Sequence, residues 1–170
     1  MSELRLAGIV EDSITDGPGI RLTVFVQGCP HHCPGCHNPQ TWPFAGGYTS
    51  TSEEVLAQIE ANPLLGGVTF SGGEPFCQAA ALLPLAEAIK NRGLELAVYT
   101  GYTFEELLNL PDPAVKQLLA LTDTLIDGPY LEAERNLELN FRGSANQRIL
   151  KARESLAAGR PLAEDAPRWH

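Results

Sequence analysis

The sequence has little positive charge: 12 lysine and arginine residues stand against 21 aspartate and glutamate residues, a formal net charge of −9. Proteins that bind nucleic acid or anionic lipid usually carry a basic surface, so this balance argues against binding to DNA, RNA or a membrane surface. The chain also lacks an apolar run of the roughly 20 residues that cross a bilayer. Residues 1–5 have neither the positive start nor the apolar core of a signal peptide, and we expect a cytoplasmic protein.

Internal repeats and low-complexity tracts are absent as well, so neither a repeat architecture nor a disordered chain is expected. Hydrophobic residues make up 44% of the sequence and charged residues 19%, a composition typical of globular proteins. The length of 170 residues is that of one ordinary domain. We therefore expect a single domain over residues 1–170.

Cysteine is scarce and unevenly distributed. Of four cysteines, Cys29, Cys33 and Cys36 fall within eight residues, while Cys77 stands apart. The cytoplasm keeps thiols reduced, so structural disulfides are not expected there, and clustered thiols indicate a metal site. We interpret Cys77 as a buried structural residue, because free cysteine is among the most buried residue types.

Strand and helix signals alternate along the chain. Short apolar runs predict strands, and amphipathic segments with capping or stop residues predict helices between them. The predicted strands are residues 4–10, 20–27, 67–71, 94–100 and 124–127. The predicted helices are residues 51–62, 78–92 and 112–121, with a short one that begins at Thr103. Beyond residue 127 the pattern is not clear enough to assign elements.

This alternation predicts an α/β fold with a mostly parallel sheet and right-handed crossovers. A closed eight-stranded barrel usually needs about 250 residues, so we expect an open, partial (β/α) barrel. Ligands of such sheets bind beyond the carboxyl ends of the strands. The cysteine loop follows one predicted strand and residues 71–75 follow the next, which places both in one site.

The cysteine spacing favours an iron–sulfur cluster. Thiolates are the usual ligands of such clusters, and a cubane normally takes four of them. Three cysteines on one loop would bind three irons and leave the fourth exchangeable, which is the open position that a catalytic metal site keeps. The spacing therefore predicts a 4Fe-4S cluster held by Cys29, Cys33 and Cys36.

Two other metal sites compete with the cluster. Residues 33–37 match the C-x-x-C-H attachment motif of c-type haem, but that reading leaves Cys29 unexplained and requires export. Three cysteines with His31, His32 or His37 could instead close a tetrahedral zinc site, although zinc ligands commonly come as two spaced pairs. His31 and His32 could also influence the cluster through hydrogen bonds to its ligands, but we expect a solvated pair on the loop.

The second candidate stretch is Ser71-Gly72-Gly73-Glu74-Pro75, between a predicted strand and a predicted helix. Residues without side chains let a ligand approach the backbone, whose polar groups can bind the ammonium and carboxylate of an amino acid. Glu74 has two compatible roles, because a carboxylate here can contact that ligand or cap the following helix.

Together the two stretches resemble the radical S-adenosylmethionine superfamily. The resemblance implies that the three thiolates hold the cluster, that the methionine part of S-adenosylmethionine chelates the fourth iron, and that Gly72, Gly73 and Glu74 contact its amino group. A reduced cluster then gives one electron to the sulfonium, and cleavage yields methionine and a 5′-deoxyadenosyl radical. Most members have an aromatic residue before the third cysteine. Gly35 stands there, and the resemblance places Gly35, Cys36 and His37 at the cofactor.

Longer stretches narrow the resemblance to the activating enzymes of glycyl-radical enzymes, in particular those of anaerobic ribonucleoside-triphosphate reductases. These stretches are residues 16–21, 27–29, 36–42, 127–130 and 142–148. The resemblance implies a reductase as protein substrate, a glycyl radical on it, and an electron donor such as flavodoxin.

Alternative functions remain at this point. The same chemistry could serve another glycyl-radical enzyme such as pyruvate formate-lyase, or a small-molecule enzyme such as 7-carboxy-7-deazaguanine synthase; a zinc-binding interaction module would involve no catalysis. Asp127 lies at the end of a predicted strand, which is where active-site residues gather. It could equally begin a turn with Gly128. Arg142 and Arg148 could bind a carboxylate or the partner protein, but we expect both to pair with acidic side chains at the surface.

Overall fold

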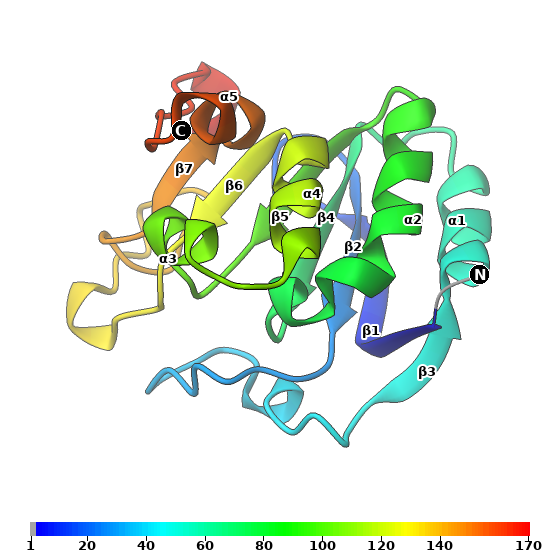
Figure 1. The fold of residues 1–170 in the computed structure, drawn as a ribbon, viewed down its shortest axis with the longest axis horizontal. Helices are drawn as coiled ribbons and strands as arrows, with labels where there is room; N and C mark the ends of the chain where they lie inside the picture. Colours follow the sequence, from blue (N-terminus) through cyan, green and yellow to red (C-terminus); the bar gives the residue numbers. More distant parts are fainter. Residues whose placement is uncertain (1–2) are drawn as a thin grey trace.

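The computed structural model describes residues 3–170 and contains a seven-stranded sheet with the order β3-β1-β2-β4-β5-β6-β7 (Figure 1). The strands are β1 (Glu3–Ser13), β2 (Arg21–Val26), β3 (Tyr48–Thr51), β4 (Gly67–Gly72), β5 (Glu95–Tyr99), β6 (Thr124–Asp127) and β7 (Arg148–Lys151). The α-helices are α1 (Ser52–Glu60), α2 (Ala79–Asn91), α3 (Phe104–Leu108), α4 (Pro113–Leu121) and α5 (Ala152–Ala158). The five predicted strands all form, and so do the four predicted helices.

The centre of the sheet is parallel and its edges are not. Strands β2, β4, β5 and β6 run parallel, as the alternation predicts. Strands β1, β3 and β7 join antiparallel. Residues 14–20 between β1 and β2 are too few for the crossover of a dozen or more residues that parallel strands need, so the chain turns back. The predicted α/β fold with an open sheet is confirmed.

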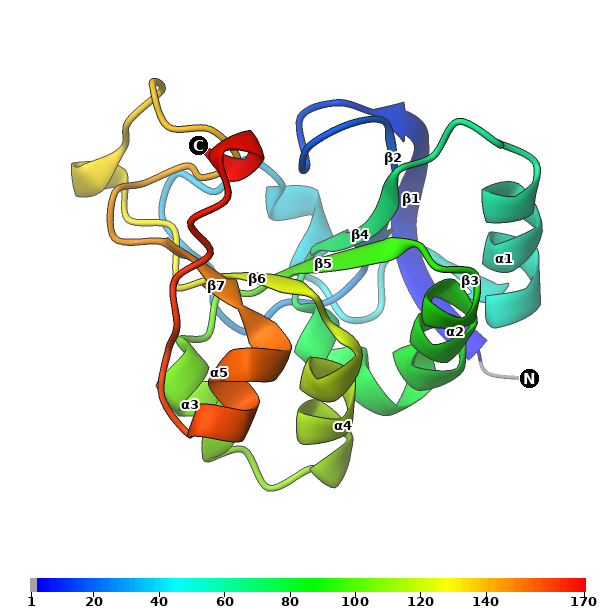
Figure 2. The same cartoon turned by 90° about the horizontal axis from the view of Figure 1, so that it is seen from above.

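All five α-helices of the described chain lie on one side of the sheet, while loops and the C-terminal turn lie on the other (Figure 2). Side chains alternate between these sides along a strand. In β5, Leu96 and Val98 belong to the main core on the helix side, whereas Ala97 belongs to a second, smaller core. A partial barrel has this arrangement, with helices only on the outside.

The second core is completed by the end of the chain. Trp169, in the short 3-10 turn Pro167–Trp169, is fully buried and clusters with Ala97, Ile126 and Ile149. The ring of Phe141 meets the Trp169 ring edge-on, with 5.4 Å between centroids. The C-terminal turn therefore covers part of the face that a closed barrel would hold inside.

Local signals explain most helix ends. Thr103 and Glu106 form a complete capping box at the start of α3, and Gly93, with φ of +73°, follows the end of α2. At α1 the Thr51 side chain accepts from the Glu54 amide, as expected, but the Glu54 carboxylate accepts from Ser50 instead of completing the box. Within residues 3–170 no helix combines the length and apolar character needed to span a bilayer.

Candidate active site

The carboxyl ends of the central strands surround a cavity of about 660 Å³. Cys29 after β2, Gly73 after β4, Thr100 after β5 and Gly128 after β6 all line it. Parallel strands bring these ends to the same edge of the sheet, which is where an open α/β sheet binds ligands. The cysteine loop and the glycine loop share one cavity, as the sequence predicts.

All three cysteines of the motif line this cavity. Cys29 is buried, and Cys33 and Cys36 are partly exposed. Burial raises the pKa of the Cys29 thiol, although backbone hydrogen bonds from His31 and His32 act in the opposite direction. Across residues 3–170 no three His, Cys, Asp or Glu side chains gather closely enough to hold a single metal ion. The thiols' role as cluster ligands stays a prediction.

The fourth cysteine does not belong to this group. Cys77 lies in the 3-10 turn Pro75–Gln78, is exposed and is not among the residues that line the cavity, so the expectation of a buried cysteine is wrong. Partial desolvation of its sulfur raises the pKa of Cys77 to about 11. Because it lies outside the cavity, Cys77 does not belong to the predicted ligand set.

The glycine loop lies directly against the strand that carries Cys29. A Cβ atom on Gly72, whose φ is +93°, would lie 2.6 Å from the Val26 nitrogen, and one on Gly73 would lie 2.3 Å from the Gly28 oxygen. The Gly73 amide donates to Val26 O at 2.8 Å and the Glu74 amide donates to Gly28 O at 2.8 Å. With these N–H groups engaged inside the fold, the loop would bind an ammonium through carbonyl oxygens, which are acceptors.

Glu74 is fully buried and is not among the residues that line the cavity. Its carboxylate accepts hydrogen bonds from Thr100, Gly101, Phe76 and His31. The bond to the Phe76 amide is the predicted cap of the following helical turn, and contact with the cofactor stays a prediction. His31 is partly buried by its bond to Glu74, so the expectation of a solvated His31 is wrong.

Two rings stand at the cavity beside the third cysteine. His37 and Tyr130 both line the cavity, and their ring centroids are 5.3 Å apart. Gly35 is exposed with φ of +77°, and a Cβ atom there would lie 3.0 Å from the Glu132 carboxylate carbon. The predicted roles of Gly35, Cys36 and His37 at the cofactor stay predictions. The sequence indicates the segment of residues 127–130 through the resemblance, but it does not predict that the Tyr130 ring lies at this cavity.

Asp127 and Arg148 have structural contacts. The buried Asp127 carboxylate accepts from the Phe104 amide at 2.7 Å and from Arg148 Nε at 3.0 Å. Arg148 also donates to Glu105 Oε1 at 2.6 Å. These bonds hold the start of α3 to the end of β6 and the start of β7. For Arg148, the expected pairing with acids is confirmed.

Arg142 differs from Arg148, because its side chain lines the cavity. The Arg142 Nε atom is buried and has no hydrogen-bond partner within residues 3–170. Guanidinium groups bind carboxylates in a two-pronged geometry, and a buried donor without a partner is costly. Arg142 is therefore the candidate in this cavity for a ligand carboxylate.

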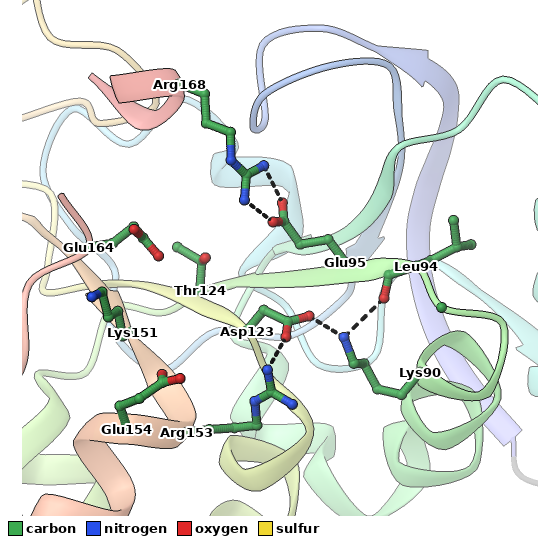
Figure 3. A pocket seen from close by; sticks show the side chains of 11 residues that line it. Lys90, Leu94, Glu95, Asp123, Thr124, Lys151, Arg153, Glu154, Glu164 and Arg168 are labelled. Atoms are coloured by element: carbon green, nitrogen blue, oxygen red, sulfur yellow. Dashed lines mark hydrogen bonds and ion pairs between the residues drawn. The ribbon is translucent and has the colours of Figure 1, made fainter. Parts of the chain in front are cut away.

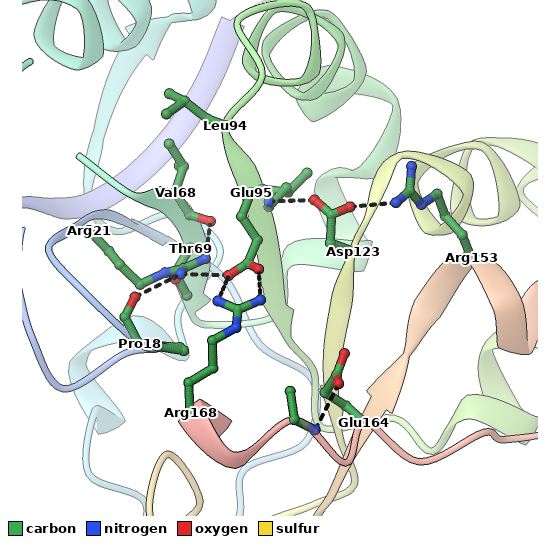
Figure 4. Close-up of polar contacts among 12 residues, drawn as sticks. Pro18, Arg21, Val68, Thr69, Leu94, Glu95, Asp123, Arg153, Glu164 and Arg168 are labelled. Atoms are coloured by element: carbon green, nitrogen blue, oxygen red, sulfur yellow. Dashed lines mark hydrogen bonds and ion pairs between the residues drawn. The ribbon is translucent and has the colours of Figure 1, made fainter. Parts of the chain in front are cut away.

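A second cavity of about 420 Å³ lies at the opposite ends of the strands, beside the amino ends of β5 and β6 (Figure 3). Asp123 lies between two basic side chains there: it pairs with Lys90 and accepts from Arg153 Nη2 at 2.7 Å. Figure 4 shows Glu95 in the same role between Arg21 and Arg168. These charges largely neutralise one another, so we place the chemistry in the cysteine cavity.

Comparison with known proteins shows the family of this chain. Residues 15–150 match the family described as the 4Fe-4S single cluster domain. An anaerobic ribonucleoside-triphosphate reductase-activating protein from Vibrio cholerae is 35% identical over 144 residues, which cover 80% of this chain and 90% of the relative. The protein of that name from Pasteurella multocida is 37% identical over 147 residues, with 81% and 91% covered.

Two further matches are less complete. A pyruvate formate-lyase-activating enzyme from Clostridium pasteurianum is 42% identical over 117 residues, which cover 64% of this chain and 49% of that enzyme. The crystal structure of QueE from Escherichia coli has a TM-score of 0.50 and 21% identity, covering 59% of this chain and 53% of that chain, and supports the fold alone. The family model matches residues 15–150, and two relatives match above 30% identity over most of both chains. The chain therefore belongs to the 4Fe-4S single cluster domain family, among the radical S-adenosylmethionine activating enzymes.

Proposed function

We propose that residues 1–170 form a single radical S-adenosylmethionine domain that generates a glycyl radical on an anaerobic ribonucleoside-triphosphate reductase. The observation that carries the proposal is the shared cavity, where three thiols and a glycine loop meet at the carboxyl ends of the parallel strands. The names of relatives at 35% and 37% identity support the identity of the partner.

A 4Fe-4S cluster and S-adenosylmethionine are the cofactors of this family, and the donor set fits them. Cys29, Cys33 and Cys36 would hold the cluster, since all three line the cavity while Cys77 does not. When bound and reduced, the cluster would supply the electron that cleaves S-adenosylmethionine. Three protein thiolates leave one metal position open for an incoming ligand.

The remaining cavity residues fit the other parts of S-adenosylmethionine. The carbonyl oxygens of the Gly72–Gly73 loop would accept from the amino group, and the Arg142 guanidinium would bind the carboxylate. The His37 and Tyr130 rings, 5.3 Å apart, provide aromatic surface for the adenine. Gly35 and Glu74 belong to the same proposed site, as the resemblance implies.

A protein substrate suits the rim of this cavity. The segment after β6 contributes Leu137 and Leu139 to its lining, and Leu137 is 80% exposed. Leu137 would therefore be available to contact an inserted segment of a protein substrate. The proposal also includes a flavodoxin-like electron donor and a cytoplasmic location, because thiol ligands need a reducing compartment.

The test is anaerobic reconstitution with iron and sulfide, followed by reduction with S-adenosylmethionine and the reductase present. We expect about four irons per chain, release of 5′-deoxyadenosine, and a glycyl-radical signal on the reductase. Cys36→Ala should abolish both products, while the matched control Cys77→Ala should retain them. Full turnover in Cys36→Ala would refute the ligand assignment.

The match to a pyruvate formate-lyase-activating enzyme makes activation of pyruvate formate-lyase the second candidate function. Parallel assays with purified reductase and purified pyruvate formate-lyase separate the two candidates. A radical signal on the lyase, with none on the reductase, would replace the first partner by the second.

A further inference from the structure

The cysteine loop carries two neighbouring histidines, and the fold anchors both. His31 Nε2 donates a 2.6 Å hydrogen bond to Glu74 Oε1, and the His31 side chain is only 16% exposed. His32 has a left-handed backbone with φ of +48°, and its ring stacks on Trp42 with 4.7 Å between centroids. The short stretch between the first two thiols is therefore fixed at two consecutive side chains.

Glu74 ties His31 to the rest of the cavity wall. Its Oε1 atom also accepts from the Thr100 hydroxyl at 2.9 Å and from the Gly101 amide at 2.8 Å, while Oε2 accepts from the Phe76 amide at 3.1 Å. A fully buried carboxylate needs such donors, because water cannot reach it. One side chain thus joins the cysteine loop, the glycine loop and the loop after β5.

The ring of His31 occupies a slot that the neighbouring residues leave open. A Cβ atom on Gly101 would lie 2.4 Å from His31 Cδ2, so the ring fits only because residue 101 is glycine. The Tyr102 ring meets the His31 ring edge-on, with 4.5 Å between centroids. The contacts with Gly101 and Tyr102 restrict the orientation of the His31 ring, and the hydrogen bond to Glu74 holds the ring inside the slot.

We propose that His31 is a positioning residue, which fixes the path of the chain between Cys29 and Cys33 through its bond to Glu74. The proposal rests on the proposed function, because it assumes that these thiols hold the cluster. Partners that orient metal ligands typically contribute about 10–100-fold to metal affinity or activity. Here the orienting residue is His31, which lies between Cys29 and Cys33 in the sequence, and the buried Glu74 carboxylate holds His31 in place.

The first experiment needs no cluster and follows the loop itself. The full chain, cluster-free and reduced, is alkylated anaerobically with iodoacetamide, and modification of Cys29 is followed by mass spectrometry. Cys29 is buried, so it reacts when the loop opens. His31→Ala should raise this rate about tenfold or more, whereas Gln40→Ala, an exposed position on the same loop, should leave it unchanged. Equal rates in the two variants would overturn the proposal.

The second experiment isolates the hydrogen bond in the reconstituted protein. His31→Gln retains a donor for Glu74, while His31→Phe retains a ring in the slot without a donor. Loss of iron to a chelator should be about tenfold faster or more in His31→Phe than in wild type, and His31→Gln should stay close to wild type. Equal iron loss in both variants would show that the bond has no positioning role. This comparison also covers the case in which His31→Ala does not fold.

The two experiments separate this inference from the proposed function. If the wild-type chain takes up no cluster, the proposed function fails, and the alkylation rates still report whether His31 holds the loop. If the wild-type chain retains its cluster and His31→Phe retains it equally long, the inference fails while the proposed function stands.

Discussion

Glu95 joins the C-terminal turn to the sheet, and replacing it by glutamine tests that connection (Figure 4). Arg21 Nη1 donates to Glu95 Oε1 at 2.9 Å, and Arg168 donates to both carboxylate oxygens. The side chains of Arg21 and Glu95 are only 1% and 17% exposed, so water screens this pair weakly. Glu95→Gln keeps the shape and leaves the buried Arg21 guanidinium without a carboxylate.

The size of the effect follows from burial. Removing one partner of a buried ion pair costs about 3–5 kcal/mol, while an exposed pair contributes about 0–1 kcal/mol. Arg21 retains bonds to the Thr69 hydroxyl at 2.8 Å and the Pro18 carbonyl at 3.1 Å, and the Arg168 side chain is 53% exposed. We therefore expect the free energy of unfolding to fall by about 3 kcal/mol at pH 7, the lower end of that range.

The dependence on pH has a definite sign. Burial alone would raise the pKa of Glu95, but hydrogen bonds from Arg168 and Arg21 outweigh burial and lower that pKa below its ordinary value. The stabilisation is therefore complete above the unfolded-state pKa of about 4.3, and is lost as the pH falls through the lower folded-state pKa. The difference between wild type and Glu95→Gln should be constant from neutral pH down to about pH 5.5, and should shrink below about pH 4.

Urea unfolding of the cluster-free proteins, followed by circular dichroism from pH 3 to pH 8, measures these differences. The matched control is Glu60→Gln, because Glu60 pairs with Arg92 at the surface, where the side chains are 52% and 37% exposed. We expect a loss of under about 0.5 kcal/mol for this control. A loss in Glu95→Gln no larger than in the control, or one that persists unchanged at pH 3, would refute the reasoning.

Three further substitutions test other parts of the structure. Arg142→Gln should raise the KM for S-adenosylmethionine about tenfold with little change in kcat, because a charge-assisted bond to the carboxylate is lost; steady-state formation of 5′-deoxyadenosine measures both constants. Trp169→Ala should lower the free energy of unfolding by about 3–5 kcal/mol in a urea titration, since the ring is fully buried. Gly73→Ala would place a Cβ atom 2.3 Å from Gly28 O, so the two loops must separate, and iron bound per chain after reconstitution should fall.

The elements that form as predicted have their signals within a few residues. The box at Thr103 and the glycine stop at Gly93 act within one helical turn, so local sequence suffices. Strand β3, with the sequence Tyr-Thr-Ser-Thr, has no apolar run, and its pairing with the distant β1 creates it. Helix α5 has no side-chain cap at Lys151 and follows a strand of four residues, which explains why residues 148–158 gave no pattern.

The candidate site also combines features that the local sequence predicts with contacts that it does not predict. The cysteine motif is local, and the rule that parallel strands present ligands at their carboxyl ends was enough to bring it beside the glycine loop. The bond between His31 and Glu74 joins residues 43 apart in sequence, and no spacing rule indicates it. The buried, unpartnered Nε of Arg142 likewise depends on how the segment after β6 folds over the cavity.

The most direct test of the open metal position is electron paramagnetic resonance of the reconstituted, reduced protein, recorded with and without S-adenosylmethionine. If Cys29, Cys33 and Cys36 are the only protein ligands, the spectrum of the cluster should change when S-adenosylmethionine binds, in the wild type and in Cys77→Ala alike. A cluster spectrum that stays the same at saturating S-adenosylmethionine would contradict an open position.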